Sequence, residues 1–181
     1  NNSSSLTVST SVTLGGTGQR VLKLIMTSGG ILKIGTTFTA STGNYTLGTG
    51  TIEYNGNANQ TVAAIAYNNL TLSGSGTKTT PSGTSVTRLL TISGTAKDSI
   101  PTGLNLSVYS LSLAGNGTVS GTWGSTSATS ATYKTNTYFA GTTGYLTIAT
   151  STALNPTVTP TIGTYTYSGS AQGPNAATNT G

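Results

Sequence analysis

Leu70-Thr71-Leu72-Ser73-Gly74 is followed by two near copies of itself, Leu90-Thr91-Ile92-Ser93-Gly94 and Leu111-Ser112-Leu113-Ala114-Gly115. A turn motif, Pro81-Ser82-Gly83, returns at nearly the same interval as Pro101-Thr102-Gly103. A strand motif and a turn motif that share one period indicate stacked coils, each burying an apolar face that it cannot bury alone. We therefore predict an all-β chain folded as a parallel β-helix or a closely related β-solenoid, with rungs of about 20 residues.

Apolar and polar residues alternate within each copy, so every second side chain is expected to point into the core. The predicted inner columns are Leu70 with Leu90 and Leu111, and Leu72 with Ile92 and Leu113. The predicted solvent-facing column is Thr71, Thr91 and Ser112. The glycines that end the copies are expected to adopt positive φ where the chain turns a corner.

The composition and the repeat pattern of the sequence change twice along the chain, which divides it into three parts. Residues 1–155 are predicted to form the solenoid stalk region, with the clearest repeats at 67–117 and a closing segment at 121–155. The closing segment is rich in large aromatic residues, which we expect to cover the last rung: Trp123, Tyr133, Tyr138, Phe139 and Tyr145. Residues 156–181 are predicted to be a linker that leads into a further module, because they are too few to bury a core of their own.

The chain is poor in charge, since only 5% of its residues are charged, against about 25% in ordinary soluble proteins. Its net charge of +5 comes from scattered basic residues, which we interpret as solubilising charges rather than a nucleic-acid-binding face: Arg20, Lys23, Lys33, Lys78, Arg88, Lys97 and Lys134. The absence of cysteine excludes disulfides and zinc–thiolate sites. No apolar run is long enough to predict a membrane span.

Catalytic side chains are scarce. The chain has no histidine and no cysteine, and its only acidic residues are Glu53 and Asp98. These two fall at different points of their expected rungs, so we do not expect them to form a catalytic carboxylate pair. No serine has a histidine to activate it, and two acids are too few for a repeated calcium site. We predict that the protein is not an enzyme and that it holds no metal or cofactor.

Three stretches resemble one group of proteins. Gly50-Thr51-Ile52-Glu53-Tyr54-Asn55-Gly56, with Gln60-Thr61-Val62 and the run from Tyr67 to Gly74, resembles the β-strand repeats of giant surface adhesins of Bacteroidetes. The segment from Gly121-Thr122-Trp123-Gly124-Ser125 to Asn136-Thr137-Tyr138-Phe139 looks like the segment that closes such arrays. Residues 156–181, with the run from Gly163 to Pro174, resemble the opening of MBG-type β-sandwich modules of bacterial adhesins. This likeness implies that residues 156–181 hold a linker and the first strands of a truncated β-sandwich module. This resemblance implies a secreted protein of the outer cell surface, exported by the type IX route.

We therefore expect a structural and adhesive segment of a secreted cell-surface adhesin or fibre. The main alternative is a glycan-binding module, for which the candidate contacts are Trp123, Tyr165 and Tyr167. A simpler role for Trp123 is to cap the core. An ice-binding module, using the column of Thr71, Thr91 and Ser112, is a less favoured variant of the same idea.

Two further possibilities follow from short segments. A self-assembling filament subunit would pair the strand in residues 1–9 and the incomplete tail with other copies of the chain by strand addition. Asp98-Ser99-Ile100 resembles the acceptor motif for protein O-glycosylation in Bacteroidetes, which would make Ser99 the modified residue. We expect this motif to lie in a turn before Pro101.

Overall fold

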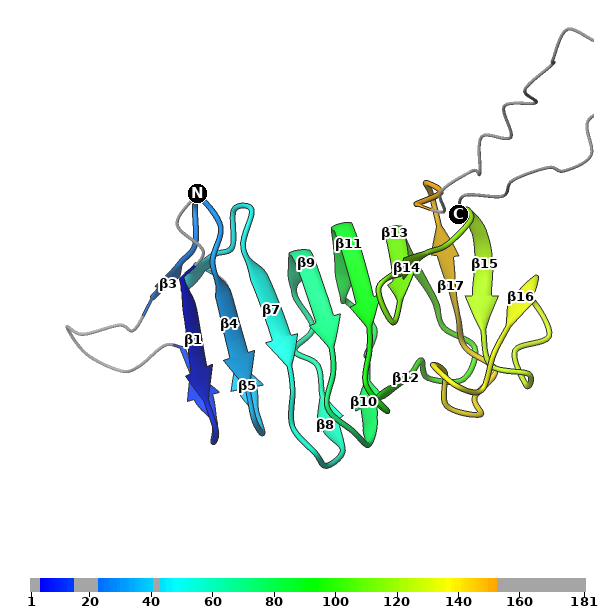
Figure 1. The fold of residues 1–181 in the computed structure, drawn as a ribbon, viewed down its shortest axis with the longest axis horizontal. Helices are drawn as coiled ribbons and strands as arrows, with labels where there is room; N and C mark the ends of the chain where they lie inside the picture. The colour runs from blue at the N-terminus through cyan, green and yellow to red at the C-terminus, as the bar shows by residue number, and fades with distance from the viewer. Residues whose placement is uncertain (1–3, 15–22, 41–42, 153–181) are drawn as a thin grey trace, which may run out of the picture.

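The computed structural model describes residues 4–14, 23–40 and 43–152, and every regular element among them is a β-strand. The largest sheet has ten strands in the order β1-β4-β7-β9-β11-β13-β17-β15-β16, with β14 beside β13. Figure 1 shows the strands of this sheet side by side along the long axis of the molecule. The first seven strands in this order pair in parallel with their neighbours. They are β1 (Ser5–Val8), β4 (Ile31–Ile34), β7 (Thr51–Tyr54), β9 (Ala66–Leu72), β11 (Ser85–Ile92), β13 (Asn105–Leu113) and β17 (Tyr145–Ile148). For the residues that the structure describes, the prediction of an all-β fold is confirmed.

The register of the main sheet brings the three sequence copies onto adjacent strands. Leu70 pairs with Leu90, and Leu90 pairs with Leu111. Each of the three leucines is at most 1% exposed, so the predicted inner column exists. The same column extends toward the amino terminus, and its successive members are register partners: Leu6, Leu32, Ile52, Leu70, Leu90 and Leu111.

Shorter ladders lie opposite the main sheet and close the core. A three-stranded parallel sheet is formed by β8 (Gln60–Thr61), β10 (Thr77–Thr79) and β12 (Lys97–Ser99). Two further parallel pairs join β2 (Val12–Thr13) to β5 (Phe38–Thr39), and β3 (Leu24–Ile25) to β6 (Tyr45–Thr46). The apolar side chains of the main sheet form one continuous core with those of the β2–β5 and β3–β6 pairs, such as Phe38 and Leu24.

The Pro-x-Gly motifs form the corners that the sequence predicts. The amide of Thr84 donates to the carbonyl oxygen of Pro81 at 3.3 Å, and the amide of Leu104 donates to that of Pro101 at 3.0 Å. Gly83 and Gly103, third in each turn, have φ of 85° and 76°. Positive φ at this position is typical of type II turns and favours glycine. The predicted positive φ is also present at the ends of the three strand copies, in Gly74, Gly94 and Gly115.

The chain changes direction after β13. β14 (Asn116–Gly117) folds back antiparallel to β13, and β15 (Gly121–Gly124) runs antiparallel to β17. β16 (Tyr133–Lys134) then pairs with β15. Phe139 is buried, whereas Tyr133 is 38% exposed, so the aromatic residues of the closing segment cover the core only in part. Residues 153–181, including the predicted sandwich module, lie outside the described residues.

Candidate functional site

The short sheet opposite the main sheet buries polar residues instead of apolar ones. Gln60 on β8, Lys78 on β10 and Asp98 on β12 are register partners in neighbouring strands. Their side chains are 5%, 0% and 0% exposed. The prediction that all basic residues are solubilising surface charges is therefore wrong for Lys78. It is the middle residue of Thr77-Lys78-Thr79, and the alternation of the strand turns it inward while its neighbours face out.

The ammonium group of Lys78 is surrounded by oxygen atoms. It donates to the carbonyl oxygens of Gly56 and Ala58 at 2.7 and 3.1 Å, and to Oε1 of Gln60 at 2.6 Å. None of these oxygens belongs to a carboxylate, so no charge of opposite sign neutralises the ammonium. Burial lowers the pKa of Lys78 to about 8, because the charged form loses its hydration.

The side chain of Gln60 connects the Lys78 ammonium to the backbone of residues 34–36. Its Nε2 donates to the carbonyl oxygens of Ile34 and Thr36, both at 2.9 Å, while its Oε1 also accepts from the amide of Gly56. One side chain therefore satisfies backbone groups at Ile34, Thr36 and Gly56. β5 and β8 are not paired with each other, so the Gln60 amide bridges a place where the backbone ladder is interrupted.

Asp98 is the third member of the column and has the fewest partners. Its Oδ1 accepts a hydrogen bond of 2.6 Å from the hydroxyl of Thr80. Its Oδ2 is buried and has no hydrogen-bond partner. Burial raises the pKa of Asp98 to about 7, with the Thr80 hydrogen bond acting in the opposite direction. The only ion pair among the described residues joins Lys33 to Glu53, so Lys78 and Asp98 are neighbours without being paired.

The predicted outer column is formed by in-register neighbours. Thr71 pairs with Thr91, and Thr91 with Ser112, and all three are half-buried. The column continues toward the amino terminus into Glu53 and Lys33, whose carboxylate and ammonium lie 3.2 Å apart. An array of hydroxyl groups is therefore limited to three strands on this face, and a charged pair borders it.

The aromatic candidate Trp123 lies on β15 in a stacked pair. Its ring and that of Tyr133 have centroids 4.7 Å apart and an interplanar angle of 23°. The indole Nε1 donates to the carbonyl oxygen of Val119 at 3.0 Å, and the ring packs against the core. Tyr133 therefore covers one face of the tryptophan. The sequence did not place Tyr133 among the candidate glycan contacts, because the stacking depends on the β15–β16 pairing. The candidates Tyr165 and Tyr167 lie outside the described residues.

Ser99, the predicted glycosylation acceptor, is the last residue of β12 and is half-buried. The expected turn is wrong at this position, since Ser99 pairs with Thr79 in the short sheet and the turn begins at Pro101. The preceding Asp98 side chain is enclosed. An enzyme that reads the Asp98 side chain together with Ser99 therefore has no access to both in the folded protein.

The two acidic residues have separate environments. Glu53 contacts Lys33 and accepts a 2.6 Å hydrogen bond from the Ser73 hydroxyl, whereas Asp98 accepts its hydrogen bond from Thr80. Within the described residues, no group of three or more metal-ligating side chains is assembled. These contacts do not bring the two carboxyl groups together as the pair that glycoside hydrolysis by two carboxylates requires.

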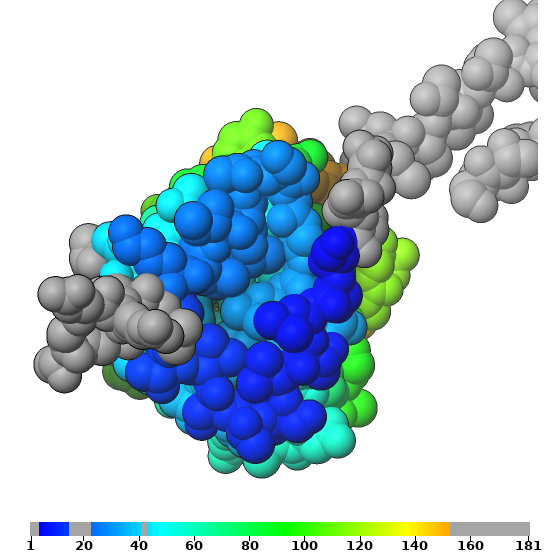
Figure 2. Space-filling model, turned by 90° about the vertical axis from the view of Figure 1, so that its left-hand side faces the viewer, coloured from blue at the N-terminus to red at the C-terminus, as the bar shows by residue number. Residues whose placement is uncertain are grey.

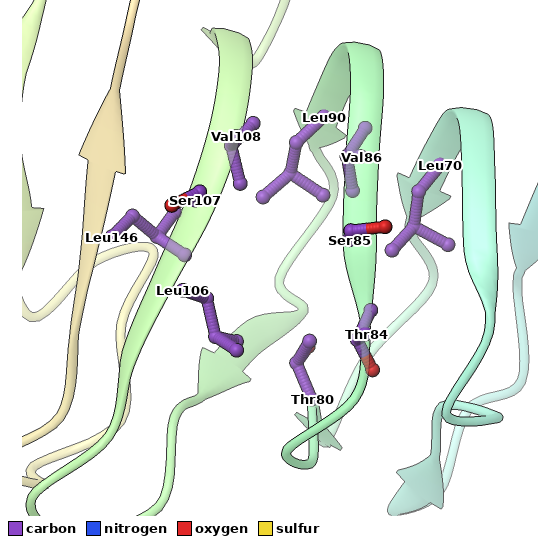
Figure 3. A pocket seen from close by; sticks show the side chains of 10 residues that line it. All are labelled: Leu70, Thr80, Thr84, Ser85, Val86, Leu90, Leu106, Ser107, Val108 and Leu146. Atoms are coloured by element: carbon purple, nitrogen blue, oxygen red, sulfur yellow. The ribbon is translucent and has the colours of Figure 1, made fainter.

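One cavity among the described residues lies in the core. Figure 3 shows a cavity between β9, β11, β13 and β17, with Thr80 and Thr84 at one end and leucine and valine side chains around it. Its volume is about 10 Å³, which suits about one water molecule rather than a ligand. Larger depressions lie on the surface: one of about 230 Å³ beside β1, β3 and β4, at the end seen in Figure 2, and one of about 310 Å³ between residues 35–37 and 58–61.

No family model matches this chain, and neither the curated proteins nor the solved structures contain a match to it. In the part of the chain that the structure describes, no helix is long and apolar enough to cross a membrane.

Proposed function

We propose that residues 4–152 form a β-solenoid that acts as a structural, non-catalytic spacer in a secreted bacterial surface adhesin or fibre. Each coil would contain about 20 residues and add about 4.8 Å to the length of the stack. The observation that carries this proposal is the unbroken series of parallel pairings from β1 to β13, which share one inner apolar column. Such a stack transmits load through backbone hydrogen bonds and packed side chains along its whole length.

The composition and the contacts of the acidic residues support the same proposal. Polar positions are filled by threonine, serine, glycine and asparagine, while charged residues make up 5% of the chain. Neutral hydroxyl surfaces of this kind suit an extracellular β protein. Glu53 is held by Lys33 and Ser73, and Asp98 is enclosed, so neither carboxylate is free to act on a substrate.

A spacer must resist extension, and the chain offers a clean way to measure this. It has no native cysteine, so cysteines introduced at Ser4 and Thr152 give unique attachment points for single-molecule pulling. We expect discrete unfolding events at forces well above those that extend an unstructured tether. Smooth extension without such events would contradict the spacer role.

An antibody against the folded chain should also label intact cells of the native host, and labelling only after lysis would contradict the surface location.

A second candidate function is glycan binding at the stacked aromatic pair. Tyr133 is 38% exposed and lies on Trp123, so the two rings offer an apolar surface of the kind that packs against a sugar ring. The residues that precede the two aromatic residues carry hydroxyl groups, and Oγ1 of Thr122 lies 3.1 Å from Oγ1 of Thr132. These groups can hydrogen bond to a neutral saccharide.

A glycan array separates this function from the spacer role. If the pair binds sugar, Tyr133→Ala and Trp123→Ala should each abolish the signals of the wild-type chain. Tyr109→Ala is the matched control, because Tyr109 is 50% exposed and belongs to no stacked pair among the described residues. Equal binding by all three variants and the wild type would remove the aromatic pair from the site.

A further inference from the structure

The buried Lys78 and Asp98 require an explanation that packing alone does not give. Both side chains are completely buried, and they occupy the same level of two adjacent parallel strands. A buried charge is costly unless it is paired. In the structure, however, the ammonium contacts only neutral oxygens, and one carboxyl oxygen has no partner.

We propose that the Lys78 amine and the Asp98 carboxyl condense to an intramolecular amide bond that links β10 covalently to β12. Parallel neighbours lie about 4.8 Å apart, a span that a lysine side chain crosses easily. The Nζ atom now lies on the Gln60 side of its strand, so rotation about the Lys78 side-chain torsions must carry it across to Asp98. The product removes two buried ionisable groups and replaces them with one neutral amide.

The surroundings supply the requirements of the condensation. Nucleophilic attack needs an uncharged amine, and burial lowers the pKa of Lys78 to about 8. The acceptor must be a protonated acid, and burial raises the pKa of Asp98 to about 7. The hydroxyl of Thr80 already donates to Oδ1 at 2.6 Å, where negative charge develops when nitrogen adds to the carboxyl carbon.

The reaction balances without an oxidant or a cofactor. Nζ forms a bond to Cγ of Asp98, and the tetrahedral intermediate places its negative charge on Oδ1 beside Thr80. The bond from Cγ to Oδ2 then breaks. Oδ2 carries the proton of the acid and takes one proton from the amine nitrogen, so it leaves as water. The products are one amide and one water molecule.

Intact mass spectrometry of the purified full chain tests the proposal. We expect the wild-type chain to be lighter than its sequence mass by one water molecule, and a tandem spectrum should show one branched peptide that joins Lys78 to Asp98. A chain with its full sequence mass would overturn the proposal. The branched peptide also distinguishes the amide from a cyclic imide at Asp98-Ser99, which loses the same water but leaves Lys78 free.

Matched variants assign the bond to these two residues. Lys78→Met should have its full sequence mass, whereas Lys97→Met, which changes the exposed lysine next to Asp98, should still lose one water. Asp98→Asn should form the same bond with loss of ammonia instead of water. If the loss of water persists in Lys78→Met, the proposed bond is wrong. Should Lys78→Met fail to fold, the branched peptide of the wild-type chain decides the question alone.

Discussion

The amino-terminal strands β1–β6 and the central strands β9–β13 follow the same parallel pairing, yet they bury their apolar side chains to different degrees. Leu6 on β1 is 61% exposed, whereas Leu90 on β11 occupies the same column and is 1% exposed. Among the described residues β1 pairs only with β4, while β11 lies between β9 and β13. The difference shows that burial in this fold depends on having a neighbour on both sides, and much less on the residue itself.

The largest expected effect comes from truncating the same residue type in the two regions. Leu90→Ala removes a buried side chain from the centre of the column and should lower the free energy of unfolding by about 2–5 kcal/mol. Leu6→Ala should lower it by less than about 0.5 kcal/mol, because the side chain is already exposed. Urea denaturation of both variants measures the contrast. Similar losses in the two variants would contradict the difference in burial between the two regions.

The next effect concerns the buried carboxyl of the central region when it cannot be linked. In Lys78→Met, the pKa of Asp98, raised to about 7 from its ordinary 3.8, makes the folded state bind its proton more tightly than the unfolded chain does. The stabilisation is complete below about pH 4 and is lost as the pH rises through about 7, with a total on the order of 4 kcal/mol.

Urea midpoints of Lys78→Met across this range should therefore fall as the pH rises. The control is the double variant Lys78→Met with Asp98→Asn, in which this decline should disappear. A pH-independent midpoint in the single variant would contradict the assignment of a raised pKa to Asp98.

A smaller effect is expected from glycines at corners of the two regions. Gly94→Ala combines a positive φ of 65° with a β-carbon placed 2.6 Å from the carbonyl oxygen of Gly74. Gly43→Ala has a φ of 85° in the amino-terminal region but meets no atom within 4 Å. Backbone strain alone costs about 1–2 kcal/mol, so thermal denaturation should show a clearly larger loss for Gly94→Ala. Equal losses would mean that the backbone around Gly74 moves to make room for the added β-carbon.

The smallest effect is expected at the ion pair on the boundary of the amino-terminal region. Lys33 and Glu53 are partly exposed, with side chains 34% and 15% accessible. A double-mutant cycle with Lys33→Ala and Glu53→Ala should give a coupling energy of about 0.2–1 kcal/mol that decreases in high salt. A coupling that is insensitive to salt would show that the pair is enclosed more fully than its exposure indicates.

The repeating strands are predicted well from the sequence. The features that depend on pairing between strands are not. The copies at Leu70, Leu90 and Leu111 are adjacent as expected, and their glycines turn the predicted corners. In contrast, Tyr133 stacks on Trp123 only because β16 pairs with β15, and no local pattern indicates that pairing.

The buried polar column was missed for a different physical reason. Lysine and aspartate are rarely buried, so these residue types predict positions on the surface. A signal was nevertheless present, since Gln60, Lys78 and Asp98 follow one another at the same intervals as the column members Ile52, Leu70 and Leu90. Extending the spacing of the leucine column to the short strands would have aligned them.

We infer that strands of this chain are stabilised by parallel neighbours on both sides. Hydrogen exchange measured on individual peptides is the most direct test of this inference. We predict the slowest exchange at β9, β11 and β13 and much faster exchange at β1, β2 and β3, because local opening costs least where a neighbour is missing. Equal protection of the amino-terminal and central strands, or slower exchange at β1 than at β11, would contradict the account.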